Sequence, residues 1–315
     1  MDSALAPRRV AALDLGSGTI KLSIFETGPR GYQALCLDEV NTELRKGMGR
    51  ELRLQVEPIA STLAACAVFV KKARSFGIET VSAYGTSALR KAVNAQDLLA
   101  PLLRRLDVTT KILNVDDEGR LNLLGVLARD PGSRVLVLDP GGDSSELCGG
   151  PDWRTAPVAS LPFGSVSLQE TYGSASDNSS IAWKKLERVA AETKDLVQSF
   201  GPAKVFIGQR LLPAIRINLP IQRTLEQVNG LPVAEHGQGG LYTYRHLEVL
   251  TQAMAATDHA GRATLMAGEP LGKVDRSCYG FASWLGVLQA LDAHEFRAEP
   301  WGIKLGAAIA LNGVI

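Results

Sequence analysis

Two stretches of the sequence share one pattern of residues that could bind phosphate. Each has a run of apolar residues, then an aspartate, then a glycine-rich turn closed by hydroxyl residues, and they cover residues 11–19 and 137–145. Glycines let the backbone bend so that several N–H groups point into one hollow, which suits a phosphate group. An aspartate at the end of a strand is placed to hold a divalent cation through its oxygen atoms. The duplication predicts two such loops that face each other across a cleft and bind a phosphate chain from both sides.

The composition indicates a globular protein with an ordinary interior. The chain of 315 residues is long for a single core, and 45% of it is hydrophobic and 21% charged. A net charge of +1 gives no overall field that would attract nucleic acid or a membrane. The four cysteines show no metal-ligand or disulfide spacing, which favours a reducing compartment. Neither a signal peptide nor an apolar run of about 20 residues is recognisable, so a cytoplasmic protein is expected.

Alternating strand and helix patterns predict α/β layers that place both loops at strand ends. The expected strands are 10–15, 20–26, 78–84, 108–113, 134–138, 144–148, 158–161 and 204–208. The expected helices are 57–76, 95–106, 119–129, 181–200, 244–256, 261–267, 275–291 and the short apolar 302–311, and residues 220–240 are expected to be irregular. The predicted domains are residues 1–129, with 302–315 packing back on them, and residues 130–301.

With both loops located, the chain resembles the exopolyphosphatase and guanosine pentaphosphate phosphatase family. The resemblance is strongest over residues 10–168, and its motifs occur in the family's order at 14–19, 85–94, 117–120, 139–147 and 160–166. The resemblance implies the actin-like ATPase (ribonuclease H-like) fold, with two α/β domains flanking a cleft. Within the family, the chain resembles the short form, which has two domains.

The resemblance also implies roles for particular residues. By matching to the family, Glu118 is the base that activates a water molecule, and Glu146 helps to orient the water or a metal ion. Asp14 and Asp139 would hold Mg²⁺, and Arg90 would clamp phosphate oxygens with its guanidinium group. The implied phosphate-binding residues of the two loops are Gly16, Ser17, Gly18, Thr19, Gly141, Gly142, Asp143, Ser144 and Ser145.

These roles predict a hydrolase that releases orthophosphate from a terminal phosphoanhydride with the help of Mg²⁺. The substrate would be inorganic polyphosphate or the guanosine pentaphosphate alarmone, because both end in this bond. Family members are often dimers, so a homodimer is one expectation. Taken without the resemblance, the acidic run 116–118 before an apolar helix is simply a helix start, and Arg90 is a solvated charge.

Departures from the family pattern leave a second reading open. Asp143 replaces the third glycine of the second loop, Gly18 stands where asparagine is usual, and a Gly-Gly-Thr turn is missing at 207–210. A carboxylate in a phosphate site repels the substrate. The alternative is therefore a protein that binds polyphosphate or guanosine tetraphosphate and has lost efficient catalysis. A sugar or acetate kinase is a third reading that rests on fold analogy alone.

Overall fold

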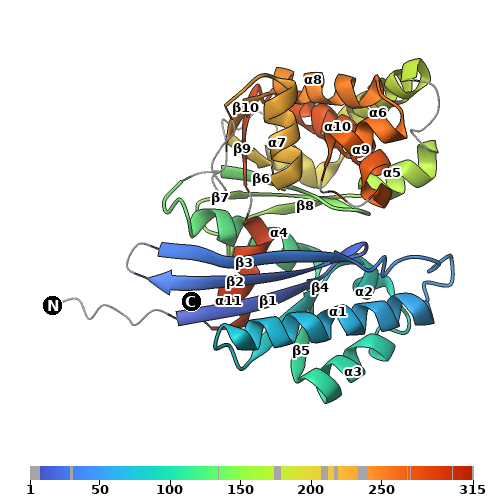
Figure 1. Cartoon of the computed structure of the whole chain (residues 1–315). Helices are drawn as coiled ribbons and strands as arrows, with labels where there is room; N and C mark the ends of the chain where they lie inside the picture. Colours follow the sequence, from blue (N-terminus) through green and yellow to red (C-terminus); the bar gives the residue numbers. More distant parts are fainter. Residues whose placement is uncertain are drawn as a thin grey trace. The chain divides into compact units, whose positions relative to one another are not determined.

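The computed structural model describes residues 8–28, 31–133, 135–173, 179–206, 212–215, 219–232, 240–267, 269, 271–299 and 301–313. The chain forms two compact units (Figure 1). The first comprises Met1–Pro131 and Gly302–Ile315, and the second comprises Gly132–Trp301. The division lies two residues beyond the boundary expected after residue 129.

The first unit is built on a five-stranded sheet in the order β3-β2-β1-β4-β5. Its strands are β1 (Arg8–Leu15), β2 (Thr19–Gly28), β3 (Gly31–Asn41), β4 (Val81–Gly85) and β5 (Val108–Ile112). Its helices are α1 (Val56–Ser75), α2 (Ser87–Lys91), α3 (Gln96–Leu106), α4 (Val115–Leu127) and α11 (Gly302–Leu311). Helices α1 and α3 lie along one face of the sheet, and α11 with α4 lies along the other (Figure 1).

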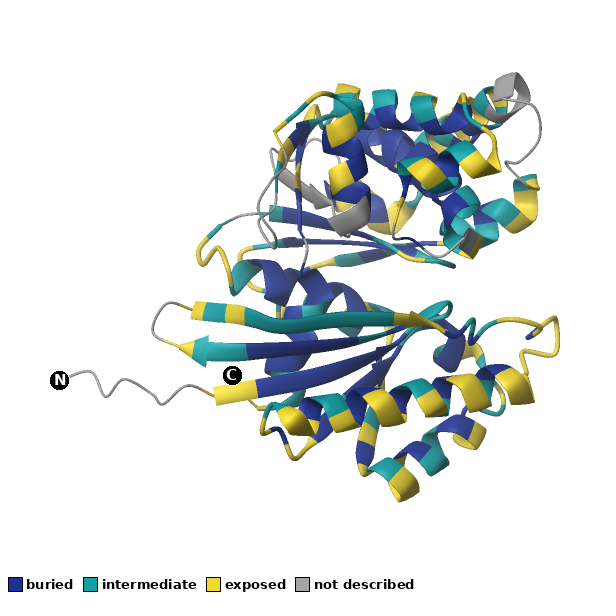
Figure 2. Ribbon diagram, in the orientation of Figure 1, coloured by how far each residue is buried: buried dark blue, intermediate teal, exposed yellow. Residues whose placement is uncertain are grey.

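The core of the first unit lies between the central strands and these helices. Buried residues concentrate on β1 and β2, whereas α1 turns a largely exposed face outward (Figure 2). Leu13, Leu22 and Ile24 have no exposed surface, because their strands are covered on both faces. The apolar run that precedes the first glycine loop in the sequence is therefore a buried central strand, and the loop lies at its end.

Helices α4 and α11 pack backbone against backbone. A Cβ atom added to Gly125 of α4 would lie 1.8 Å from the carbonyl oxygen of Gly302, and one added to Gly306 would lie 1.8 Å from the carbonyl oxygen of Leu121. Only glycine permits helices to approach so closely. The two glycines thereby fix the position of α4 against the last helix of the unit.

The second unit has a six-stranded sheet in the order β10-β11-β9-β6-β7-β8. Its strands are β6 (Val135–Pro140), β7 (Ser145–Gly150), β8 (Val158–Leu161), β9 (Leu212–Ile215), β10 (Leu241–Thr243) and β11 (Glu295–Ala298). Its helices are α5 (Ser165–Tyr172), α6 (Ser179–Ser199), the 3₁₀ helix η1 (Gly201–Phe206), α7 (Leu219–Val228), α8 (Tyr244–Ala255), α9 (His259–Leu265) and α10 (Leu271–Ala290).

The strand order of the first unit is repeated in the second. Strand β1 pairs with β2 in antiparallel fashion and with β4 in parallel, and β6 pairs likewise with β7 and β9. The next neighbours also correspond, because β3 and β8 continue the antiparallel side while β5 and β11 continue the parallel side. The repeat seen in two short sequence stretches thus extends to whole sheets.

Two sequence expectations in the second unit were wrong. Residues 204–206, the described part of the expected strand 204–208, belong instead to η1. The buried residues Ala203 and Phe206 of η1 are three apart, which matches the 3₁₀ repeat. The segment 220–240 is not irregular throughout, because α7 occupies its first part and buries Ile221 and Leu225 at helical spacing. Residues 207–210, where the family's Gly-Gly-Thr turn is missing from the sequence, lie outside the described residues. Within the described part of the chain, no helix combines the length and apolar character that a membrane crossing requires.

Candidate functional site

The first glycine loop is the tight turn between β1 and β2. The N–H of Gly16 donates to the carbonyl oxygen of Thr19 at 3.2 Å and closes the turn. A Cβ atom on Gly16 would lie 2.8 Å from that oxygen, which is closer than real side chains approach. Glycine is therefore required at this position by the close approach of the turn to itself.

The carbonyl groups of this loop are held by the segment that follows β3. The N–H of Arg45 donates to the Ser17 oxygen at 2.9 Å, and the N–H of Thr42 donates to the Gly18 oxygen at 3.0 Å. Among the described residues, none accepts a hydrogen bond from the N–H of Ser17 or Gly18. Because the carbonyl groups are engaged and these N–H groups are not, the loop can donate to an anion.

Asp14 lies at the start of this turn and is buried. The hairpin register places Lys21 of β2 directly opposite it, and the lysine Nζ is 3.8 Å from Asp14 Oδ2. The carboxylate expected to bind a metal ion thus has a cation beside it. Lys21 was not among the residues expected at the site, although the register of a hairpin around a short turn could have indicated it.

The second glycine loop, between β6 and β7, has the same backbone pattern. The N–H of Gly141 donates to the carbonyl oxygen of Ser144 at 2.9 Å, and a Cβ atom on Gly141 would lie 2.5 Å from that oxygen. Here the start of α5 holds the carbonyl groups, since Val166 N–H donates to the Gly142 oxygen at 2.8 Å. In the described part of the chain, the N–H groups of Gly142 and Ser144 have no acceptor.

Acidic residues surround the second loop. Asp139 at the end of β6 lies opposite Glu146 of β7, and both are buried. Ser160 of β8, which sequence reasoning did not select, donates its hydroxyl to Glu146 Oε1 at 2.9 Å and so fixes that carboxylate. Asp143 is also buried, with 7% of its surface exposed. The hydroxyl of Ser145 donates to the carbonyl oxygen of Phe163 at 3.0 Å, so it is used within the protein.

Arg90 and Glu118 form an ion pair in the first unit. Arg90 Nη1 donates to Glu118 Oε2 at 2.9 Å and to the carbonyl oxygen of Leu113 at 2.7 Å. Arg90 is part of α2, which follows β4, and Glu118 is in α4, which follows β5. Strands β4 and β5 are parallel neighbours, so the segments after them begin at the same edge of the sheet. Sequence reasoning selected both residues but not their contact, which this topology could have indicated.

The three acidic residues in the first turn of α4 have different partners and different burial. Asn114 caps the helix by accepting a hydrogen bond from Asp117 N–H at 2.7 Å. Asp117 pairs with Lys111 at 2.9 Å, and Asp116 lies 3.7 Å from Arg120. These two acids are surface residues of an ordinary helix start, stabilised by the helix dipole. Glu118 is buried and faces Arg90, so it differs from its neighbours in environment as well as in partner.

The residues selected from the sequence therefore fall into two groups. In the first unit Gly16, Ser17, Gly18 and Thr19 form one loop beside Asp14, and Arg90 contacts Glu118. In the second unit the loop 141–145 lies beside Asp139 and Glu146. Among the described residues, no group of three or more His, Cys, Asp or Glu side chains is arranged to hold a metal ion.

Comparison with known proteins gives a consistent family. The sequence matches the Ppx/GppA phosphatase family over residues 23–308. It is 31% identical over 167 residues to Exopolyphosphatase 1 of Mycobacterium leprae, covering 51% of this chain and 48% of that protein. The Mycobacterium tuberculosis protein of the same name gives 31% identity over 167 residues, covering 51% of this chain and 47% of that protein. These matches thus span about half the length of the curated relatives.

The fold is shared with solved structures over nearly the whole chain. The Aquifex aeolicus member of the Ppx/GppA family superimposes with a TM-score of 0.80 at 21% identity, covering 98% of each chain. An exopolyphosphatase from Cytophaga hutchinsonii gives a TM-score of 0.78 at 18% identity, covering 97% of this chain and 98% of that one. The expected fold class, the actin-like ATPase fold with two α/β domains, is confirmed.

Proposed function

Because this chain belongs to the Ppx/GppA phosphatase family, we propose that it is a hydrolase that releases orthophosphate from a terminal phosphoanhydride. The proposed substrate is inorganic polyphosphate or guanosine pentaphosphate, which offer the same terminal bond. The observation that carries this proposal is the ion pair between half-buried Arg90 and buried Glu118, the latter in the first turn of α4. It provides an acceptor for a proton and a guanidinium group for phosphate oxygens at one place.

Arg90 can hold Glu118 and bind phosphate oxygens at the same time, because different nitrogen atoms are available for the two tasks. Its two hydrogen bonds within the protein both come from Nη1, so within the described residues Nη2 and Nε have no partner. A guanidinium group has five N–H donors, and the free pair can bind two phosphate oxygens in parallel. The side chain is thus anchored at one end and remains able to hold a phosphate group.

Glu118 is the proposed acceptor of the proton from the attacking water. Hydrolysis needs a water molecule aimed in line at the terminal phosphorus and positive charge on the phosphate oxygens. The bond from Arg90 to Oε2 fixes the Glu118 carboxylate, whose two oxygen atoms offer about four acceptor positions, so that it can also accept the hydrogen bond of a water molecule. The N–H groups of Ser17 and Gly18, and those of Gly142 and Ser144, are the proposed donors to the phosphate chain.

Mg²⁺ is the proposed metal ion, and the donor set of the second unit fits it. Asp139 and Glu146 are cross-strand partners, so their side chains share one face of the sheet, and hard carboxylate oxygens are the ligands that Mg²⁺ prefers. Asp14 is the further proposed ligand, although Lys21 already lies beside it. The ion would neutralise charge on the transferred phosphate group.

The test of this function is release of orthophosphate from polyphosphate by the wild-type protein and by Glu118→Gln. The glutamine variant keeps the shape and a hydrogen-bond acceptor but removes the base. The proposal predicts that turnover is lost while polyphosphate binding remains. Equal rates in the two proteins would show that Glu118 does not act in hydrolysis.

A second candidate function is favoured by Asp143, whose buried carboxylate replaces a glycine of the family's loop. In this case the protein binds polyphosphate or guanosine tetraphosphate without turning either over efficiently. Calorimetry with both compounds, together with a long incubation assay, separates the two functions. Tight binding without phosphate release over hours supports the binding protein, and rapid release rejects it.

A cytoplasmic location remains part of the proposal. Cys36, Cys66, Cys148 and Cys278 are all free thiols. Free thiols persist in a reducing compartment, which agrees with this location.

A further inference from the structure

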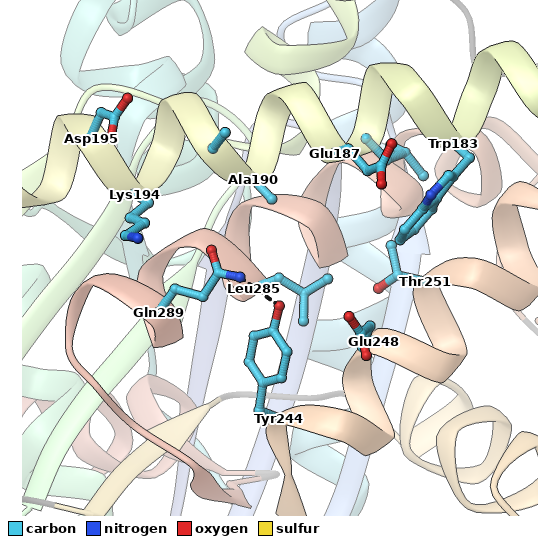
Figure 3. Close-up of a pocket in the computed structure, with 12 residues that line it drawn as sticks. Trp183, Glu187, Ala190, Lys194, Asp195, Tyr244, Glu248, Thr251, Leu285 and Gln289 are labelled. Atoms are coloured by element: carbon cyan, nitrogen blue, oxygen red, sulfur yellow. Dashed lines mark hydrogen bonds between the residues drawn. The ribbon is translucent and has the colours of Figure 1, made fainter.

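The second unit contains a hollow that takes no part in the proposed hydrolysis. It has a volume of about 350 Å³ and lies between α6 and α8 above α10 (Figure 3). This volume is within the range of small-molecule sites. None of its lining residues belongs to the loop 141–145 or to the strands that flank it.

Side chains reach this hollow from one stripe on each helix. On α6 the stripe is Trp183, Glu187, Ala190 and Lys194, whose spacings of four, three and four residues keep them within about 60° around the axis. Ala190 leaves room between the two charged residues. Asp195 is off this stripe, and its carboxylate points away from the ammonium group of Lys194 (Figure 3).

One end of the hollow suits a cation. Trp183 extends from α6 toward Thr251 of α8, with Glu187 near it on α6 and Glu248 beyond Thr251 on α8 (Figure 3). Glu248 is also paired with Arg245, whereas Glu187 has no hydrogen-bond or ion-pair partner among the described residues. An indole ring next to unpaired carboxylate is a favourable setting for an ammonium group.

The other end suits an anion. Lys194 points into the hollow there, and it too has no partner in the described part of the chain (Figure 3). Gln289 Nε2 donates to the Tyr244 hydroxyl oxygen at 2.7 Å, so the tyrosine O–H remains available as a donor. Burial, assisted by the charge of Glu248, raises the pKa of Tyr244, which keeps that hydroxyl protonated at neutral pH.

We propose that this hollow binds a small zwitterion whose ammonium group pairs with Glu187 beside Trp183 and whose carboxylate pairs with Lys194 and Tyr244. Glu187 and Lys194 are seven residues apart, which is about 10 Å along the helix axis. With the two charged groups taken at this axial separation, two charged hydrogen bonds of about 2.8 Å each leave about 5 Å between the two charges of the ligand. This separation corresponds to an amino acid with its amino group on the γ carbon rather than on the α carbon.

The test is a binding series measured by calorimetry and by the indole N–H resonances of the protein. The compounds are glycine, γ-aminobutyrate and ω-aminooctanoate, with butylamine and butyrate as the separate halves. The proposal predicts that γ-aminobutyrate binds at least about fivefold more tightly than any other compound in the series. Butylamine and butyrate each lack one ion pair, and glycine and ω-aminooctanoate have the wrong distance between their charges. It also predicts a shift of the Trp183 resonance, which the Trp183→Phe variant identifies.

Variants check which residues recognise the two charges. Glu187→Gln and Lys194→Met should each weaken γ-aminobutyrate binding about fivefold, and Glu187→Gln should leave butyrate binding unchanged. Lys184→Met, an exposed change on α6 outside the hollow, is the matched control and should have no effect. Equal binding of all five compounds, or no binding at the solubility limit, would overturn the proposal. Phosphate release by these variants should equal that of the wild-type protein, so this result stands apart from the test of Glu118.

Discussion

In the first unit the glycine loop between β1 and β2 lies beside Asp14 and Lys21, and in the second unit the loop between β6 and β7 lies beside Asp139 and Glu146. The hairpin registers are equivalent, because each aspartate faces the residue seven positions later. The closing hydrogen bonds are also equivalent, from Gly16 to Thr19 and from Gly141 to Ser144. The two loops therefore have the same backbone hydrogen bond and register, and they differ in the charge of the residue that faces the aspartate.

This difference indicates how the two loops would share the work of binding. Beside the first loop an aspartate and a lysine balance each other at 3.8 Å. Beside the second loop two buried carboxylates share one face of the sheet, and Asp143 adds a third buried acid. Carboxylate oxygens that share one face of a sheet are suitable ligands for Mg²⁺. Metal dependence of the activity is therefore expected to originate in the second unit.

The largest effect is expected from Glu118→Gln, which tests whether chemistry belongs to the first unit. Loss of the base should lower the rate of orthophosphate release about a thousandfold. Asp117→Asn is the matched control, because this neighbouring acid pairs with Lys111 at the surface, and it should retain the wild-type rate. A similar loss in both variants would mean that the first turn of α4 matters only for stability.

The next effect concerns the shared backbone of the two loops. Gly141→Ala places a Cβ atom 2.5 Å from the Ser144 carbonyl oxygen, so thermal unfolding should show a loss of about 2 kcal/mol. Gly16→Ala should behave similarly, since its contact with Thr19 is 2.8 Å. Gly142→Ala meets only the Val166 side chain at 3.2 Å and should cost much less. Equal costs at Gly141 and Gly142 would argue against the tight turn.

The charge difference between the loops is tested by titration with Mg²⁺. Glu146→Gln removes one of the two facing carboxylates and should raise the Mg²⁺ concentration needed for half-maximal activity about tenfold. Glu295→Gln, at an exposed position in the same sheet, is the control. If Lys21→Met changes the Mg²⁺ requirement more than Glu146→Gln does, the first unit is the metal-binding one.

The smallest effect is expected from Asp143→Gly, which makes the second loop more like the first. Removing this carboxylate should strengthen polyphosphate binding about fivefold, because the proposed metal ion would offset most of the repulsion between Asp143 and the phosphate chain. Gly18→Asp makes the reverse exchange and should weaken binding. Binding by calorimetry measures both, and weaker binding by Asp143→Gly would show that the acid assists, for example as a metal ligand.

Much of this fold could be predicted from local patterns in the sequence. Helices such as α1 and α6 have clear apolar periodicity, and β1 and β6 end in recognisable glycine turns. Strand β3 was not predicted, because it pairs only with β2 at the sheet edge and its residues are half-buried. The strand prediction for 204–208 was wrong at 204–206, because a short apolar run suits a strand and a 3₁₀ turn equally.

The residues of the candidate site could be predicted from the sequence, but the contacts between them could not. Glu118 and Arg90 were selected from motifs, yet their ion pair depends on β4 and β5 being parallel neighbours. Lys21 lies in no motif and Ser160 only begins the 160–166 motif, and the strand registers place these two residues beside Asp14 and Glu146. Such contacts are set by sheet topology, which local sequence patterns do not contain.

The close crossing of α4 and α11 at Gly125 and Gly306 has a consequence for how the protein is made. Residues 302–313 complete the first unit, but the ribosome adds them only after all of the second unit. During translation the segment that carries Glu118 is therefore made before the helix that covers one side of α4. The second unit can already fold as a whole by then. Assembly of the proposed catalytic carboxylate in its final setting would be among the last events of synthesis.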